Sequence, residues 1–305
     1  NIAIGAYALD ATSTNAHTGT IAIGHQALTS CTSGAGNTAI GFTAGLGVTT
    51  GAKNTLIGYS AGAVATNSGL GLTTSGFNTA VGYETLGANS DDAITTAGYN
   101  TCMGYRAGYE LQNDGANNAF LGAFAGASVT TGSQSVMVGP SAGETLNTSG
   151  NVTLIGYRSG AAILADQITT NGTVAIGHSA LTALTSGAKN TAIGFEAGHD
   201  VTAGSRNTYI GYQAGDKTNS SENVAVGAVS LGGSGVYNSV AVGYGAGEAY
   251  TGNSSVFVGS GVAAGASASG ANNVGVGRNA LLVITTGSTN VAIGSNAMDA
   301  SILAS

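Results

Sequence analysis

Two segments of the sequence match the Gly-x-Ser-x-Gly motif that presents the nucleophilic serine of many hydrolases. Gly58–Gly62 reads Gly-Tyr-Ser-Ala-Gly, and Gly139–Gly143 reads Gly-Pro-Ser-Ala-Gly. In other copies of the same pattern, the position of the serine holds Gln26, Thr43, Glu84, Arg106, Arg158, Glu196, Gln213 or Asn279. A position that accepts either charge is expected to face solvent. We interpret both matches as products of an internal repeat, and we predict no catalytic residue and no enzyme activity.

The other residues suited to chemistry are scattered along the chain. Cys31 and Cys102 lie far apart, without the spacing of a disulfide framework or a zinc site, and are expected to be small apolar core residues. Asp91 and Asp92 are adjacent but stand alone. The four histidines, which have no recurring acidic neighbour, are His17, His25, His178 and His199. We therefore predict neither a metal site nor a cofactor.

One repeated position is enriched in aromatic residues. It holds Phe42, Tyr59, Tyr83, Tyr105, Tyr157, Phe195, Tyr212 and Tyr244. Such rings are expected to form a ladder along one edge of the protein. The ladder could bind glycans by ring stacking, or it could pack at a subunit interface with its hydroxyl groups in water. We favour the interface.

The composition excludes the common protein classes. Of 305 residues, 52 are glycine and one is proline, while 7% are charged and 43% are hydrophobic. Disordered linkers contain fewer apolar residues, and collagen needs abundant proline with glycine at every third position. The formal net charge of −7 disfavours a nucleic-acid partner. No apolar run reaches the roughly 18 residues that span a bilayer, so we expect no membrane insertion.

The pattern Asn-Thr-Ala-Ile-Gly recurs through residues 1–305, which we interpret as a single repeat array. Each copy ends in a glycine, called here the anchor glycine. The 17 anchors are Gly5, Gly24, Gly41, Gly58, Gly82, Gly104, Gly122, Gly139, Gly156, Gly177, Gly194, Gly211, Gly227, Gly243, Gly259, Gly277 and Gly294. Insertions lengthen the repeat near residues 63–76, 87–98 and 161–172, where we expect surface loops that could form a binding face.

Each repeat of about 17 residues predicts one coil of a parallel β-solenoid, because it is too short for two helices. The residue before the anchor is aliphatic in every copy, and the residue two places earlier is almost always β-branched. Strand side chains alternate, so this pair shares one face. We expect the pair to fill the interior, and the residue between them, mostly alanine, to face a neighbouring chain. Asparagine four residues before the anchor is expected to form a hydrogen-bonded ladder at a corner.

The repeat resembles known fibre proteins. Segments such as Asn37–Gly45 and Asn190–Gly198 resemble the head repeats of YadA-type trimeric autotransporter adhesins. Segments such as Gly104–Gly108 and Gly211–Gly215 are similar to repeats of phage tail fibres. The resemblance implies a left-handed parallel β-roll, three chains in one fibre, and an extracellular role in attachment. The chain departs from these families because it shows no coiled-coil stalk, membrane anchor or autocleaving chaperone domain.

These observations favour a non-enzymatic, extracellular, structural or adhesive fibre shaft, either a surface adhesin or a tail fibre, that forms a homotrimer. Its expected partners are further copies of itself, and cell-surface glycans or another host surface. One alternative is an ice-binding β-solenoid, suggested by threonine pairs at 49–50, 73–74, 95–96, 130–131, 169–170 and 285–286. The other is a polysaccharide-degrading tail protein, which would need a pair of carboxylates in a groove.

Overall fold

The computed structural model describes residues 1–11, 18–63, 72–87, 97–148, 150–163, 171–265 and 268–299. The chain divides into two compact units, the first formed by Asn1–Val152 and the second starting at Thr153. The first unit contains β1 (Ile2–Ile4), β2 (Ile21–Ile23), β3 (Thr38–Ile40), β4 (Thr55–Ile57), β5 (Thr79–Val81), β6 (Thr101–Met103), β7 (Ala119–Leu121) and β8 (Val136–Val138). The second contains β9 (Thr153–Ile155), β10 (Val174–Ile176), β11 (Thr191–Ile193), β12 (Thr208–Ile210), β13 (Val224–Val226), β14 (Val240–Val242), β15 (Val256–Val258), β16 (Val274–Val276) and β17 (Val291–Ile293).

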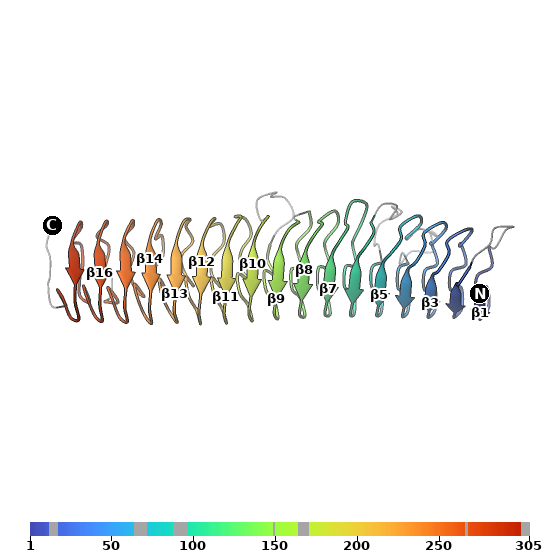
Figure 1. The fold of residues 1–305 in the computed structure, drawn as a ribbon, viewed down its shortest axis with the longest axis horizontal. Coiled ribbons are helices and arrows are strands. Elements are labelled where there is room, and N and C mark those ends of the chain that lie inside the picture. The colour runs from blue at the N-terminus through green and yellow to red at the C-terminus, as the bar shows by residue number, and fades with distance from the viewer. Residues whose placement is uncertain are drawn as a thin grey trace. The chain divides into compact units, whose positions relative to one another are not determined.

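Each coil contributes one three-residue strand, and within each unit consecutive strands pair in parallel (Figure 1). The register aligns equivalent positions, so that Ala22 lies opposite Ala39 and Ile23 opposite Ile40. The predicted all-β parallel β-solenoid is therefore confirmed. No helix that could span a membrane occurs among the described residues.

The prediction of which strand face points into the coil is wrong. The middle residue of every strand from β2 to β17 is buried, whereas the flanking residues are half-buried or exposed; in β3, Ala39 is fully buried and Ile40 is 36% exposed. Side-chain alternation sets which residues share a face, but not which face is inside. The interior of each coil holds the middle residue, small or large, and the flanking aliphatic residues form the outer face of the sheet.

The volume of the middle residue is balanced by the residue four places after the anchor glycine. Small and large residues alternate between the two positions, because they compete for the same interior space. Several middle alanines pair with leucine, as in Ala22 with Leu28, Ala80 with Leu86, Ala175 with Leu181 and Ala225 with Leu231. Larger middle residues pair with glycine, as in Leu56 with Gly62, Phe120 with Gly126, Leu154 with Gly160 and Tyr209 with Gly215.

Ala39, Ala192 and Ala241 are exceptions, and the coil of Ala39 shows how neighbouring coils share the interior. In the coil of Ala39 both interior positions hold small residues, because Gly45 stands four places after the anchor glycine. A Cβ atom on Gly45 would lie 2.8 Å from a δ-carbon of Leu28 in the preceding coil and 2.8 Å from a δ-carbon of Leu56 in the following coil. The large side chains above and below therefore fill this coil, and the core is packed continuously along the stack.

The anchor glycines are required by both backbone conformation and space. Their φ angles lie between 123° and 141°, a region that residues with a Cβ rarely adopt. A Cβ atom on Gly41 would also overlap the carbonyl oxygen of Gly58 in the next coil. Glycine at this position allows the chain to turn at the end of each strand while consecutive coils remain in contact.

A ladder of buried asparagines connects consecutive coils, as the sequence predicts. The backbone N–H of Asn54 donates to the side-chain Oδ1 of Asn37 at 2.8 Å, and that of Asn78 donates to Asn54 Oδ1 at 3.0 Å. Each side-chain amide also donates to a corner carbonyl, as from Asn54 Nδ2 to Ser75 O at 3.0 Å. In the second unit the ladder runs through Asn190, Asn207, Asn223, Ser239, Ser255, Asn273 and Asn290.

We predict that Asn54→Asp destabilises the protein by about 2 to 4 kcal/mol at neutral pH, because a fully buried carboxylate replaces an amide donor. Burial raises the pKa of such a carboxyl above its value in the unfolded chain. The loss of stability is therefore smallest in acid and grows as the pH rises through the folded-state pKa. Urea unfolding followed by circular dichroism at several pH values measures this loss. Asn151→Asp, at an exposed position, is the control and should change stability little.

We also predict that Ala80→Leu lowers stability by about 1 to 3 kcal/mol, because Leu86 already fills the shared space. The double variant Ala80→Leu, Leu86→Gly reproduces the arrangement of Leu56 and Gly62 in the preceding coil. It should recover most of the lost stability in the same unfolding measurement. Equal destabilisation by the single and double variants would contradict the proposed sharing of volume.

Candidate functional site

The outer face of the sheet is the most regular surface of the protein. We use this term for the two flanking positions of each strand, such as Thr38 and Ile40 in β3. All the flanking residues in β1 to β17 are Thr, Ala, Val, Ile, Leu or Met, so the face carries no charge. The exposed aliphatic members, each 36–42% exposed, include Ile40, Met103, Leu121 and Val136 in the first unit and Ile193, Ile210, Val256 and Val258 in the second.

The predicted aromatic residues follow the strands directly, after the anchor glycine, and most of them form stacks. In the first unit Phe42, Tyr59, Tyr83 and Tyr105 stack with ring centroids 4.9–5.4 Å apart and interplanar angles of 7–15°. In the second unit Phe195 and Tyr212 stack at 5.5 Å. Tyr244 stands apart, since Ala228 occupies the same position in the coil between it and Tyr212. We call these stacked rings the aromatic ladder.

Two histidines belong to the aromatic ladder, which the sequence analysis missed. His25 stacks on Phe42 at 5.1 Å, and His178 stacks on Phe195 at 5.0 Å and contacts Tyr157 at 5.2 Å. Both histidines stand directly after an anchor glycine, at the aromatic position. Comparing residues by position in the repeat, rather than by neighbours in the chain, would have placed them here.

The stacking determines what the aromatic ladder can bind. A sugar stacks on the open face of a ring, but the faces of Tyr59 and Tyr83 are each covered by rings of the coils above and below. What remains exposed is the ring edges, together with the hydroxyl groups. The pKa of Tyr83 is raised, first by a hydrogen bond to Glu84 and then by the charge of Glu84, so its hydroxyl stays protonated. The geometry suits packing against another protein surface better than sugar stacking.

The position of the motif serines lies in the turn after the anchor glycine, where equivalent side chains of consecutive coils come together. Ser60 is buried, and its Oγ lies 2.8 Å from Thr43 Oγ1 in the preceding coil. The expectation that this position faces open solvent is wrong for several copies, because equivalent side chains in consecutive coils bond to each other. Arg106 donates to Glu84 at 2.7 Å, and Gln213 donates to Glu196 at 2.7 Å.

Both cysteines are buried, as expected of core residues. Cys102 is the middle residue of β6, and burial raises the pKa of its thiol, so it remains protonated and unreactive. Several other predicted features lie outside the described residues. They are His17, Asp91, Asp92, the threonine pairs 95–96 and 169–170, and most of the insertions near 63–76, 87–98 and 161–172.

A polar cluster of the second unit was not anticipated from the sequence. His199 and Asp200 follow β11, and Asp216 follows β12; one potential ligand atom from each lies within 4.8 Å of the other two. His199 Nδ1 is 2.8 Å from Asp200 Oδ1. Burial raises the pKa of Asp216, and the charge of Asp200 adds to this effect. His199 and Asp216 share the fifth position after their anchors, Gly194 and Gly211, which is the signal that would have found them.

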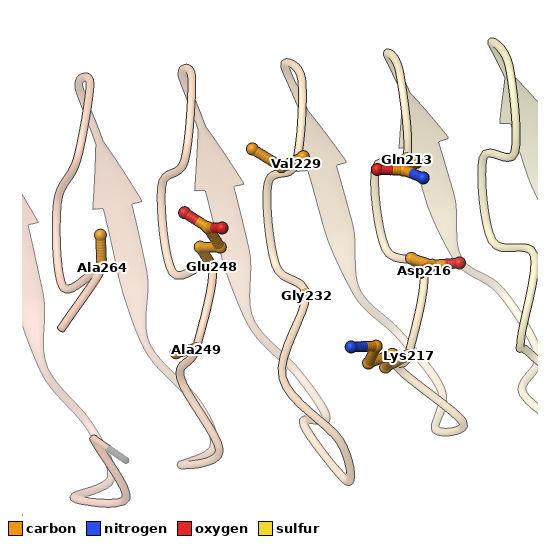
Figure 2. Close-up of a pocket in the computed structure, with 8 residues that line it drawn as sticks. All are labelled: Gln213, Asp216, Lys217, Val229, Gly232, Glu248, Ala249 and Ala264. Carbon is orange, nitrogen blue, oxygen red and sulfur yellow. The ribbon is translucent and has the colours of Figure 1, made fainter. Parts of the chain in front are cut away.

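A shallow hollow of about 470 Å³ begins beside this cluster (Figure 2). The coils after the one that carries Asp216 and Lys217 have small residues at this edge, such as Gly232 and Ala264, and these leave the space open. Its lining residues are Gln213, Asp216, Lys217, Val229, Gly232, Glu248, Ala249 and Ala264. In Figure 2 the Lys217 amine points toward the side of Gly232, whereas the Asp216 carboxylate points the opposite way, toward the preceding coil.

We predict that Tyr83→Ala, which removes a ring stacked on both sides, destabilises the protein by about 1 to 3 kcal/mol. Tyr244→Ala is the matched control, because Tyr244 occupies the same repeat position beside Ala228. Thermal unfolding and near-ultraviolet circular dichroism should both respond more strongly to the first substitution. Equal responses would show that ring stacking contributes little.

Comparison with known proteins does not identify this chain. No protein-family model matches it, and no curated protein has significant sequence similarity to it. The fold and the surfaces described above are therefore the basis for a functional proposal.

Proposed function

We propose that this protein is a non-enzymatic structural fibre shaft that assembles as a homotrimer outside the cell and serves attachment. The observation that carries the proposal is the uncharged, aliphatic outer face of the sheet. Exposed aliphatic side chains occur on several strands of each unit, and Ile40 and Ile193 are 36% and 37% exposed. Contiguous apolar surface of this kind is typical of sites of association.

The outer face replaces the interface expected from the sequence. The alanine-rich middle positions cannot contact another chain, because they form the core of the coils. The flanking side chains take their place: they are exposed on strands such as β3, β8, β11 and β15, and half-buried on others. Three copies of one uncharged face can meet around a threefold axis without electrostatic repulsion. The resemblance of the repeat to trimeric fibre proteins supports three chains rather than two.

The aromatic ladder adds specificity to such an interface. Its rings lie just beyond the strands, with their faces occupied by each other and their edges exposed. Tyrosine at an interface can bury its ring edge and keep its hydroxyl group in water. Repetition of the contact in every coil multiplies weak interactions. A long shaft can thereby hold its chains together although each coil contributes little.

The ice-binding alternative gains no support from the threonine pairs. The first threonine of a pair is used within the stack, as where Thr49 Oγ1 donates to the carbonyl oxygen of Thr73 at 2.8 Å. Only the second threonine of a pair, such as Thr50, is exposed, so the pairs offer at most one row of exposed threonines at the corner. An ice-binding face needs a wider regular array, so the shaft remains the better proposal.

The test is a charge placed on the outer face. The protein with Ile40→Lys and Ile193→Lys should remain folded, because both positions are partly exposed, and should become monomeric. Burying an unpaired ammonium group costs several kcal/mol, so the dissociation constant should rise about a hundredfold or more. Sedimentation velocity and light scattering measure the mass, and circular dichroism checks the fold.

Val283→Lys is the control for this experiment. Val283 is 39% exposed but lies in a turn after β16, not on the outer face, so the substitution should leave the trimer intact. A monomeric parent protein would refute the homotrimer. A double variant that stays trimeric would show that the chains associate through another surface.

A further inference from the structure

We propose that His199, Asp200 and Asp216 bind one divalent transition-metal cation, of the class of Zn²⁺ and Co²⁺, which connects the coils that follow β11 and β12. The proposal concerns the second unit alone and is independent of the proposed assembly. One donor atom from each of the three side chains lies within 4.8 Å of the others. Donors bound to one Zn²⁺ at about 2.0–2.2 Å lie up to roughly 4 Å apart, so small side-chain rotations bring all three to a cation.

The backbone holds the three residues in place. Asp200 N–H donates to the carbonyl oxygen of Asp216 at 2.9 Å, which links the two coils directly beside the cluster. His199 N–H donates to Glu196 O at 3.2 Å within its own turn. The side chains therefore start from fixed positions, and a cation between them would not require the chain to rearrange.

An independent observation concerns Asp216. Its Oδ1 atom is shielded from solvent and has no hydrogen-bond partner, while the residue as a whole is half-buried. A buried carboxylate oxygen without a partner is strongly unfavourable. Figure 2 shows the Asp216 carboxylate directed away from Gly232, and one of its oxygens lies within 4.8 Å of ligand atoms of His199 and Asp200. A cation in the cluster supplies the partner that this oxygen lacks.

The surrounding charges favour a cation at this place. Lys217, the nearest basic side chain on the same turn, points its amine toward Gly232 and away from the cluster (Figure 2). Burial and Asp200, with a smaller effect of Glu196, raise the pKa of Asp216 against the opposing charges of His199 and Lys217. The Oε2 atom of Glu196 also accepts a hydrogen bond from Gln213. The site thus combines two carboxylates with a third nearby, and no guanidinium or ammonium group pairs with Asp216 at hydrogen-bond distance in the described structure.

The donor set selects the class of metal. Ca²⁺ takes six to eight oxygen ligands and Mg²⁺ prefers octahedral oxygen ligands, whereas one imidazole and two carboxylates match the preferences of Zn²⁺, Co²⁺ or Mn²⁺. Water entering from the hollow beside Asp216 and Lys217 can complete the coordination. The site joins adjacent coils, so its expected effect is to stabilise the second unit.

The experiment uses the full, untagged chain, stripped with a chelator and titrated with ZnCl₂ by calorimetry, or with CoCl₂ followed by visible absorption. We expect one metal ion per chain and a melting temperature that rises with metal concentration. Asp216→Asn and His199→Ala should each weaken binding at least tenfold. Asp299→Asn is the matched control, since Asp299 occupies the same repeat position in the coil of β17, and it should leave binding unchanged.

Asp216→Asn also separates a metal site from a general loss of structure. In the presence of chelator this variant should be at least as stable as the parent, because it removes an unpaired buried charge, yet it should lose the metal-dependent rise in melting temperature. The proposal is overturned if the parent binds neither metal below about 1 mM. It is equally overturned if both ligand variants bind as tightly as the parent.

Discussion

Paired strands of consecutive coils lie about 4.8 Å apart, and this close stacking constrains the rest of the structure. It requires the anchor glycines, because any side chain at Gly41 would overlap the backbone of Gly58. It allows buried asparagines, because the amide of one coil accepts a hydrogen bond from the backbone of the next. The same spacing is suitable for stacked aromatic rings. Positions repeated in every coil are therefore occupied by residues that interact favourably with themselves.

The sequence predicts whatever depends on this repetition. The strands, the parallel register and the asparagine ladder follow from a period of about 17 residues and from residue types that recur at fixed positions. The period does not predict which face of each strand points into the coil. Alternation places Ala39 on one face and Ile40 on the other, but it does not say which face is inside. The complementary sizes of Ala80 and Leu86 indicate which face is inside, because two residues compensate for each other in size when both lie in the same interior.

The candidate sites show the same division. The aromatic ladder is predictable because its position recurs, and His25 and His178 would be recognised by their repeat position. The cluster of His199, Asp200 and Asp216 occurs once, so no period reveals it. It depends on which side chains two particular coils bring together. Repetition in sequence thus identifies surfaces that extend along a unit, whereas a local site requires the three-dimensional structure.

Charge within a stack follows from the same spacing. Opposite charges at one position in consecutive coils form ion pairs, as Arg106 does with Glu84 in the first unit and Arg206 with Glu222 in the second. Asp200 and Asp216 depart from this arrangement, because two carboxylates meet where the nearest amine, that of Lys217, points away. Lys217 and His199 act against the rise in the pKa of Asp216 but do not cancel it, and no ammonium or guanidinium group lies at hydrogen-bond distance from Asp216 in the described structure. A cation from solution would supply the partner that Asp216 Oδ1 lacks.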